Sequence, residues 1–177
     1  MNTSLEKIQL PDFILADLYK ENLVILKEIQ VIEKQTARIK NELPETKWFL
    51  GDNKKNICIV VNDLEAVYLN EDLLNFLTTI LGACKLNLGD VAILNYNNNH
   101  FQYSFIKEQL SPKYLLLFNI EANAIQLPFT IPYYQVQQYD KCSILTAPTL
   151  QIMLGTTEEA KLHKSRLWLC LKKMFTI

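Results

Sequence analysis

Three short runs of consecutive apolar residues constrain the fold of this chain more than any other feature. The runs are ICIVV at 57–61, VAIL at 91–94 and YLLLF at 114–118. A strand covered on both faces by helices shows such an unbroken run, whereas a half-exposed strand alternates apolar and polar residues. The sequence therefore predicts strands buried at the centre of a sheet. Further strand candidates are 124–127, 134–138 and 143–145.

Helical patterns fill the gaps between these runs. Asn70 can cap a helix whose first turn is acidic, and carboxylates are favourable at that end of the helix dipole. The apolar stripe of this helix consists of Leu73, Leu74, Leu77, Ile80 and Leu81. Gly82 is expected to end it. A second helix is expected over 101–110, where Pro112 follows shortly after the end.

The last helix carries the clearest start signal. Thr156 and Glu159 have the spacing of a capping box, and the helix is predicted to run to about Met174. Its expected core side comprises Leu162, Leu167, Trp168, Leu171 and Phe175. Its many basic residues indicate a solvated helix face, with a weak nucleic-acid contact as the alternative. These residues are Lys161, Lys164, Arg166, Lys172 and Lys173.

Strands alternating with helices predict βαβ units and a mainly parallel sheet. We therefore expect one α/β domain over residues 1–177, with 1–50 as a helical extension packed on it. Ligand sites in such sheets lie beyond the carboxyl ends of the strands. In this chain those positions are 62–63, 95–99, 119–121 and 146–149.

The N-terminal extension contains one amphipathic segment and one ambiguous one. Pro11 can open a helix whose apolar face is formed by Phe13, Ile14, Leu18 and Tyr19. That face can pack on the domain's own core, or it can bind a partner protein. Segment 23–32, LVILKEIQVI, fits either a strand or a helix, and its β-branched residues favour a strand at 23–25.

Charge and hydropathy limit the classes of function. The chain has 18 Lys plus Arg and 19 Asp plus Glu, a net charge of -1. Proteins dedicated to duplex binding usually carry a large positive excess, because phosphate contacts supply most of their affinity. No apolar run is long enough for a membrane helix, and the N-terminus lacks the pattern of a signal peptide. We therefore expect a cytoplasmic protein without a membrane contact.

The residues that most often build cofactor and metal sites are scarce. The chain has four glycines, and none has the spacing of a G-x-G-x-x-G turn or a P-loop, so a nucleotide site of these types is not expected. Its two histidines have no cysteine or carboxylate at ligand spacing, and no metal site is predicted. The four cysteines stand in apolar surroundings and form no C-x-x-C pair, which indicates buried free thiols.

Asp63 is the one carboxylate with a case for chemistry. It follows the buried strand 57–61 at a position where an acid can face a cleft and act as a general base. The alternative is a turn residue that binds its own backbone. Glu65 beside it fits a solvated loop charge.

Tyr133, Tyr134 and Tyr139 form an aromatic cluster in the polar segment YYQVQQYD. Such a cluster can provide a stacking platform for bases or a protein interface. Alternatively, the rings belong to an edge strand and turn one face to the core.

Two segments, 57–95 and 145–175, resemble the psi subunit of bacterial DNA polymerase III. In the first, a strand ending in VVNDL at 60–64 precedes a leucine-rich helix and a strand reading DVAIL. In the second, a strand ends in Ala-Pro at 147–148, and the following helix carries an internal Leu-Trp at 167–168. The two segments together cover less than half of the chain.

The resemblance implies a fold and a role. The psi family has the uracil-DNA glycosylase fold, a three-layer α/β/α sandwich with a short, mostly parallel sheet. Psi is similar to a glycosylase without its active site, and it bridges the clamp loader to the chi subunit, which contacts single-strand-binding protein. The resemblance therefore implies a non-catalytic adaptor without a cofactor. Its partners would be a clamp-loader subunit and a chi-like subunit, with weak or indirect contact to nucleic acid.

A comparison with the glycosylase motifs gives the same expectation. When the glycosylase loop G-Q-D-P-Y is aligned on Asp63, Val61 replaces the glycine and Glu65 replaces the tyrosine. The motif H-P-S-P falls on 145–148, so that Leu145 replaces the histidine. Losing a preorganised donor of that kind costs on the order of 3 kcal/mol. The vestigial positions are then Asn62, Asp63, Leu145 and Pro148, and no catalytic residue is assigned.

Two other functions stay open from the sequence. The first is a divergent or degenerate DNA glycosylase that acts on single-stranded or damaged DNA through Asp63. The second is a module that binds a small ligand on the same fold.

Overall fold

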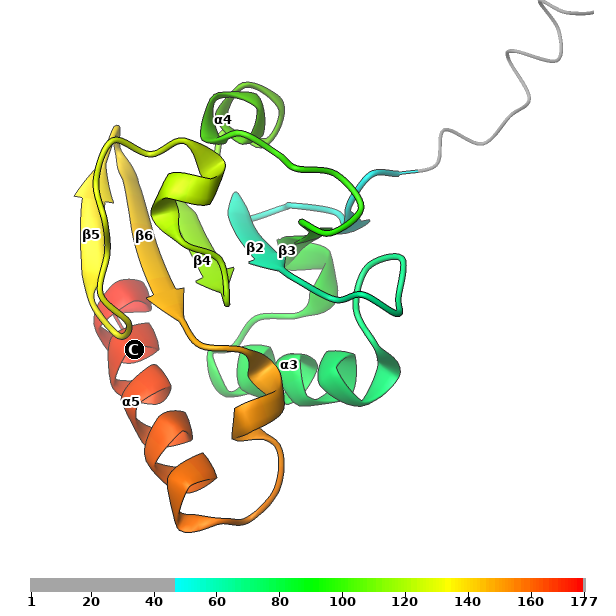
Figure 1. Ribbon diagram of the computed structural model, residues 1–177, viewed down its shortest axis with the longest axis vertical. Helices are drawn as coiled ribbons and strands as arrows, with labels where there is room; N and C mark the ends of the chain where they lie inside the picture. The colour runs from blue at the N-terminus through cyan, green and yellow to red at the C-terminus, as the bar shows by residue number, and fades with distance from the viewer. Residues whose placement is uncertain (1–46, 177) are drawn as a thin grey trace, which may run out of the picture. The chain divides into compact units, whose positions relative to one another are not determined.

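The computed structural model describes residues 47–176, which form a mixed α/β fold around one sheet of six strands (Figure 1). The strands are β1 (Leu50–Gly51), β2 (Ile57–Val61), β3 (Val91–Asn95), β4 (Tyr114–Phe118), β5 (Val136–Tyr139) and β6 (Cys142–Ala147). The helices are α3 (Glu71–Ala83), α4 (Tyr103–Leu110) and α5 (Glu158–Phe175). Short 3₁₀ turns cover Leu88–Asp90, Ala122–Ile125 and Leu150–Met153.

The strand order is β1-β3-β2-β4-β6-β5. The four inner strands run parallel, and the edge strands β1 and β5 are antiparallel to their neighbours. The register places Val60 of β2 beside Leu94 of β3 and Leu117 of β4. The carboxyl ends of the inner strands therefore meet at one edge of the sheet.

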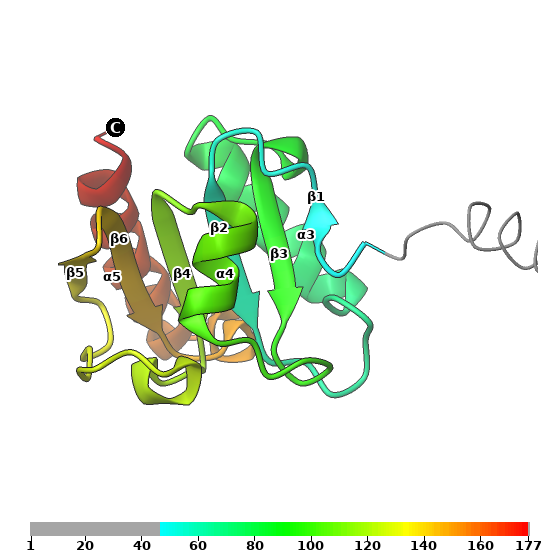
Figure 2. The same cartoon turned by 90° about the horizontal axis from the view of Figure 1, so that it is seen from above.

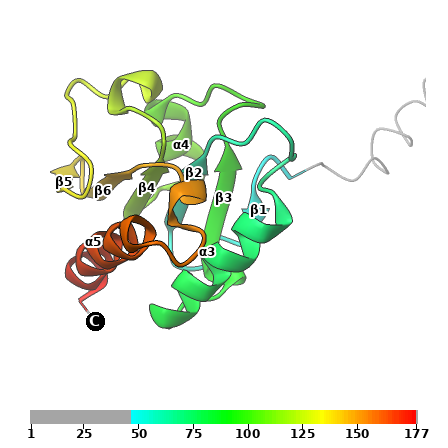
Figure 3. The same cartoon turned by 60° about the horizontal axis from the view of Figure 1, so that its bottom comes forward.

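The apolar runs form the centre of the sheet, as predicted. All residues of β2, β3 and β6 are buried, and so are all residues of β4 after Tyr114. Alternate residues of a strand point to opposite faces. On one face, Ile57 and Ile59 belong to the core under α3 and α5 (Figure 3). On the other face, Cys58 and Val60 pack with α4 and the 122–125 turn (Figure 2).

The predicted start of α3 is confirmed, and its predicted end is wrong. The Asn70 side chain caps the helix by accepting a 3.0 Å hydrogen bond from the Asp72 N–H. The helix continues through Gly82 to Ala83. Lys85, with a φ of 57°, adopts the left-handed conformation expected at Gly82. The Leu86 N–H donates to the Leu81 carbonyl across this turn, which closes the helix without a glycine.

The start of α5 lies one residue later than the capping-box pattern indicates. Thr157, not Thr156, is the N-cap, and its hydroxyl accepts a hydrogen bond from the Ala160 N–H. Leu162 lies off the core side of the helix, because it precedes Leu167 by five residues instead of three or four, and 49% of it is exposed. Trp168 is half-buried, whereas Leu167 and Leu171 are core residues as expected. The helix ends at Phe175, next to the predicted Met174.

The other predicted elements are shifted or replaced. The strand expected at 124–127 is a 3₁₀ turn, because this segment leaves the sheet to cover one of its faces. The helix expected over 101–110 begins at Tyr103. The strands expected at 134–138 and 143–145 are Val136–Tyr139 and Cys142–Ala147. In residues 47–176, no helix is both long and apolar enough to span a bilayer.

The predictions for the N-terminal extension lie outside the described residues. They comprise the helix opened by Pro11, the ambiguous segment 23–32 and the amphipathic face of Phe13, Ile14, Leu18 and Tyr19.

Candidate functional site

A depression of about 660 Å³ lies beyond the carboxyl ends of β2, β4 and β6. Three loops and the start of α3 supply its walls. The residues concerned are Asn62, Asp63, Leu64, Glu65, Asn70, Asp72, Leu73, Asn119, Thr149, Gln151 and Leu154. This is where ligand sites lie in open α/β sheets.

Asp63 is buried, and its carboxylate binds the backbone of its own loop. One oxygen, Oδ1, accepts hydrogen bonds from the Glu65 N–H at 2.9 Å and the Ala66 N–H at 3.3 Å. The other, Oδ2, accepts from the Asn70 N–H at 2.8 Å. Both oxygens are therefore used to shape the 62–70 loop and the entry to α3. This geometry is that of an Asx turn, the alternative to a general base.

Asn95, the last residue of β3, holds the same loop from the neighbouring strand. Its Oδ1 accepts from the Asp63 N–H and the Asn97 N–H, both at 3.1 Å. Its Nδ2 donates to the carbonyls of Asp63 and Ala66, both at 2.8 Å. The amide thus makes all four hydrogen bonds that an asparagine side chain commonly makes. Two buried side chains, Asp63 and Asn95, therefore hold the 62–70 loop in place at the depression.

The rim of the depression is acidic and partly apolar. Asp63, Glu65 and Asp72 line it, and no lysine or arginine of residues 47–176 does. Leu64 is 80% exposed and Leu154 is 37% exposed. Val67, in the same loop as Leu64, is 70% exposed. The surface therefore combines negative charge with large apolar side chains in water.

The positions aligned with glycosylase motifs are only partly brought together. Asn62 and Asp63 line the depression, and Pro148 follows the end of β6. Leu145 does not lie there. It is a buried core residue within β6, between Leu116 of β4 and Val136 of β5. The expected position was wrong because β6 runs on to Ala147, so the strand end is two residues later.

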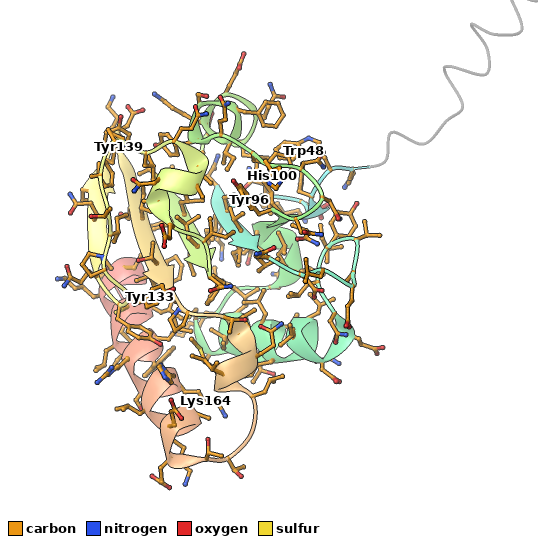
Figure 4. The ribbon with its side chains drawn as sticks, in the orientation of Figure 1. Trp48, Tyr96, His100, Tyr133, Tyr139 and Lys164 are labelled. Atoms are coloured by element: carbon orange, nitrogen blue, oxygen red, sulfur yellow. The ribbon has the colours of Figure 1, made fainter. Side chains whose placement is uncertain are left out.

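The three tyrosines do not form one stacking platform. Tyr133 and Tyr139 lie toward opposite ends of the β5 region (Figure 4). Tyr134 packs against α5, where its hydroxyl is 2.6 Å from Nδ1 of His163. Tyr139 contacts the rings of Tyr103 and Phe129 on the other face of the sheet. The edge-strand alternative therefore describes the segment better.

The cysteines are free thiols, as predicted. Three of them are buried, and Cys170 is partly exposed. Burial raises the pKa of the Cys58 thiol far above its usual range, and it raises the pKa of Cys142 to about 12. A thiol with such a pKa is protonated near neutral pH, and the thiolate is the nucleophilic form. These two cysteines are therefore packing residues.

The sequence reasoning missed Asn95 and the exposed leucines. Asn95 is expected from the sequence among the positions 95–99 beyond a strand end, whereas it is the buried last residue of β3. The usable signal was its place directly after VAIL, beside the strand that precedes Asp63.

Within the part of the chain that the structure describes, no three His, Cys, Asp or Glu side chains are grouped closely enough to hold a metal ion. Comparison of the sequence with known protein families and with curated proteins finds no match.

Proposed function

We propose that this chain is a non-catalytic accessory subunit of the bacterial replicative DNA polymerase. It acts in the cytoplasm as a psi-like adaptor that links the clamp loader to other replisome proteins. The observation that carries the proposal is the state of the Asp63 carboxylate. Both of its oxygens are bound by N–H groups of the loop that it shapes. These N–H groups occupy three of the about four acceptor sites of the carboxylate, which leaves it little capacity to take a proton from substrate or water.

The rim of the depression supports a protein partner rather than DNA. DNA-binding proteins neutralise phosphates with Lys and Arg, and the exposed carboxylates of Glu65 and Asp72 would repel a phosphate chain. Exposed apolar side chains such as Leu64 and Leu154 are typical of surfaces that bind proteins. The charge of the rim therefore counts against the alternative of a divergent DNA glycosylase.

The arrangement of the elements is compatible with a three-layer α/β/α sandwich similar to uracil-DNA glycosylase. In support, four neighbouring strands run parallel, and helices cover both faces of the sheet. The apolar face of Phe13, Ile14, Leu18 and Tyr19 is proposed as the contact with the clamp loader. A chi-like subunit is the proposed partner of the rim.

The proposal can be tested by binding of the full chain to reconstituted clamp-loader complex and to a chi-like subunit, using surface plasmon resonance. We expect dissociation constants in the micromolar range or below. Leu64→Asp combined with Leu154→Asp should abolish binding of the chi-like subunit, because it removes apolar contact area. Leu162→Asp on α5 is the matched control, since Leu162 is also exposed but does not line the depression.

The enzyme alternative is tested in parallel. Release of uracil from single-stranded DNA by the wild-type chain, and its loss in Asp63→Asn, would replace the adaptor by a glycosylase. Absence of binding to any clamp-loader subunit at micromolar concentration would also refute the proposal.

A further inference from the structure

A second hollow lies between α3 and α5, on the side of these helices away from the sheet. Its volume is about 190 Å³, less than that of typical small-molecule pockets, which have about 300–1,000 Å³. Its walls are Phe76, Ile80 and Ala83 of α3 and Lys164, Trp168 and Leu171 of α5. None of its lining residues also lines the depression at the carboxyl ends of the strands. We call this hollow the α3/α5 groove.

Small side chains on α3 leave the groove open. Thr79 and Ala83 are four residues apart and therefore lie on one face of the helix. Neither reaches far enough to fill the space beside Trp168. As a result, two large aromatic rings, Phe76 and Trp168, border a hollow of about 190 Å³, a volume that suits one bulky apolar side chain.

The rim of the α3/α5 groove is positive. Lys164 Nζ lies 5.6 Å from the centre of the Phe76 ring, and it is held there by a 2.7 Å hydrogen bond to the Gly155 carbonyl. Lys172 does not itself line the groove, but its Nζ lies 5.9 Å from the centre of the Trp168 ring, which does. Among residues 47–176 neither lysine is paired with a carboxylate, and no acidic residue lines the groove. Figure 4 shows the position of Lys164 on α5.

From this combination we infer that the α3/α5 groove binds an acidic segment of a partner protein that carries one bulky apolar side chain. The apolar side chain enters between Phe76 and Trp168. Carboxylates on either side of it meet Lys164 and Lys172, which form no ion pair with a carboxylate of the described residues. Apolar burial supplies the anchor, and charge complementarity selects acidic over basic segments.

This inference deepens the proposed function. It gives the proposed adaptor a second docking surface, whose charge is opposite to that of the depression at the strand ends. Peptide binding to the groove nevertheless does not require that the partner belong to the replisome. A synthetic peptide can therefore test the groove without any clamp-loader protein, and failure of one proposal is distinguishable from failure of the other.

The probe is a fluorescein-labelled peptide with one phenylalanine flanked by aspartates, titrated with the full chain and followed by anisotropy. Its matched controls carry lysines in place of the aspartates, or alanine in place of phenylalanine. We expect the acidic phenylalanine peptide to bind at least about tenfold more tightly than either control. In NMR spectra, the indole signal of Trp168 should shift on binding while that of Trp48 stays in place; a Trp168→Phe variant assigns the two signals.

Three substitutions locate the site. Lys164→Glu and Lys172→Glu should each weaken binding about tenfold, because an attraction becomes a repulsion. Ala83→Leu should weaken it by filling the hollow without changing the charge. Lys173→Glu is the control, since Lys173 lines a different hollow, beside Tyr134 and Leu169, whereas Lys172 lies over the Trp168 ring. Circular dichroism of each variant checks that it is folded.

Equal binding of the acidic and basic peptides would overturn the inference. Unchanged affinity in both Lys164→Glu and Ala83→Leu would do the same. A Trp168 signal that shifts with protein concentration in the absence of peptide would assign the groove to a second copy of the chain instead.

Discussion

Asn95→Asp tests whether one buried amide holds the candidate site together. The substitution replaces Nδ2 by an oxygen of nearly the same size. In the wild type, Nδ2 donates to the carbonyls of Asp63 and Ala66, both at 2.8 Å. A carboxylate oxygen cannot donate to either, so that two carbonyls lose their partner and face a negative charge.

The expected loss of stability follows from these two contacts. A buried polar group that loses its hydrogen bond costs about 1–3 kcal/mol. Two such groups give a loss of about 3 kcal/mol. With a urea dependence of about 1.5 kcal/mol per molar, the midpoint of unfolding should fall by about 2 M.

The loss should also depend on pH. Burial among carbonyl oxygens raises the pKa of the introduced carboxyl in the folded protein above its unfolded value of about 3.9. The destabilisation is smallest at a pH below the unfolded pKa, where the carboxyl is neutral in both states. The free energy of unfolding then falls as the pH rises through the raised pKa of the folded state. The difference between variant and wild type should therefore shrink between pH 7 and pH 4.

The assay is urea unfolding followed by circular dichroism at both pH values. Asn99→Asp is the control, because it makes the same chemical change at an exposed position in the loop that follows β3. Limited proteolysis should in addition cut the 62–70 loop faster in Asn95→Asp. Surface substitutions typically change the free energy of unfolding by less than about 0.5 kcal/mol. If the free energies of unfolding of the two variants differ by no more than this, Asn95 does not hold the loop.

Four further predictions concern backbone and thiols. Gly51→Ala should cost about 3 kcal/mol in chemical unfolding, because Gly51 has a φ of 105° and a Cβ there would lie 2.2 Å from the Val91 carbonyl oxygen. Gly155→Ala, with a positive φ but open space, should cost only about 1 kcal/mol. Alkylation at pH 8 should label Cys170 and leave Cys142 unmodified until urea is added, as mass spectrometry can show. Burial raises the pKa of Cys142 from about 9 to about 12, so this thiol contributes its full stabilisation below pH 9. The free energy of unfolding should therefore fall by up to about 1.4 kcal/mol per pH unit as the pH rises from 9 toward 12. Cys142→Ala should reduce this slope, measured by urea unfolding at several pH values.

The centre of the fold follows from local sequence. A run such as ICIVV can only be covered on both faces, and this property is independent of its neighbours. The start of α3 is equally local, because Asn70 binds an N–H two residues away. Both features were therefore predictable, and so was the position of the candidate site at the carboxyl ends of the strands.

Features that depend on distant partners were not predictable in the same way. The length of β6, and with it the burial of Leu145, is set by pairing with β4 and β5. Asn95 has its role only because β3 lies beside β2, which brings it to the Asp63 loop. For α5, Thr156 and Thr157 offer equivalent hydroxyl groups. The helix packs on the sheet through Leu167 and Leu171, which leaves Leu162 exposed, a result that the capping pattern alone did not give.

The charge distribution connects the two proposed surfaces. The whole chain has a net charge of -1, yet the depression at the strand ends is lined by three carboxylates and the α3/α5 groove by a lysine. An adaptor must bind two partners without one displacing the other, and surfaces of opposite sign achieve this because each repels the partner of the other. Neither surface has the continuous positive charge that a nucleic-acid backbone requires. Salt should weaken the electrostatic part of binding at both proposed surfaces. The apolar contribution to binding, from Leu64 at one surface and Trp168 at the other, should remain. In a double variant, Leu64→Asp with Ala83→Leu, each substitution should weaken binding of its own partner by the same factor as it does alone, because the two lining sets share no residue.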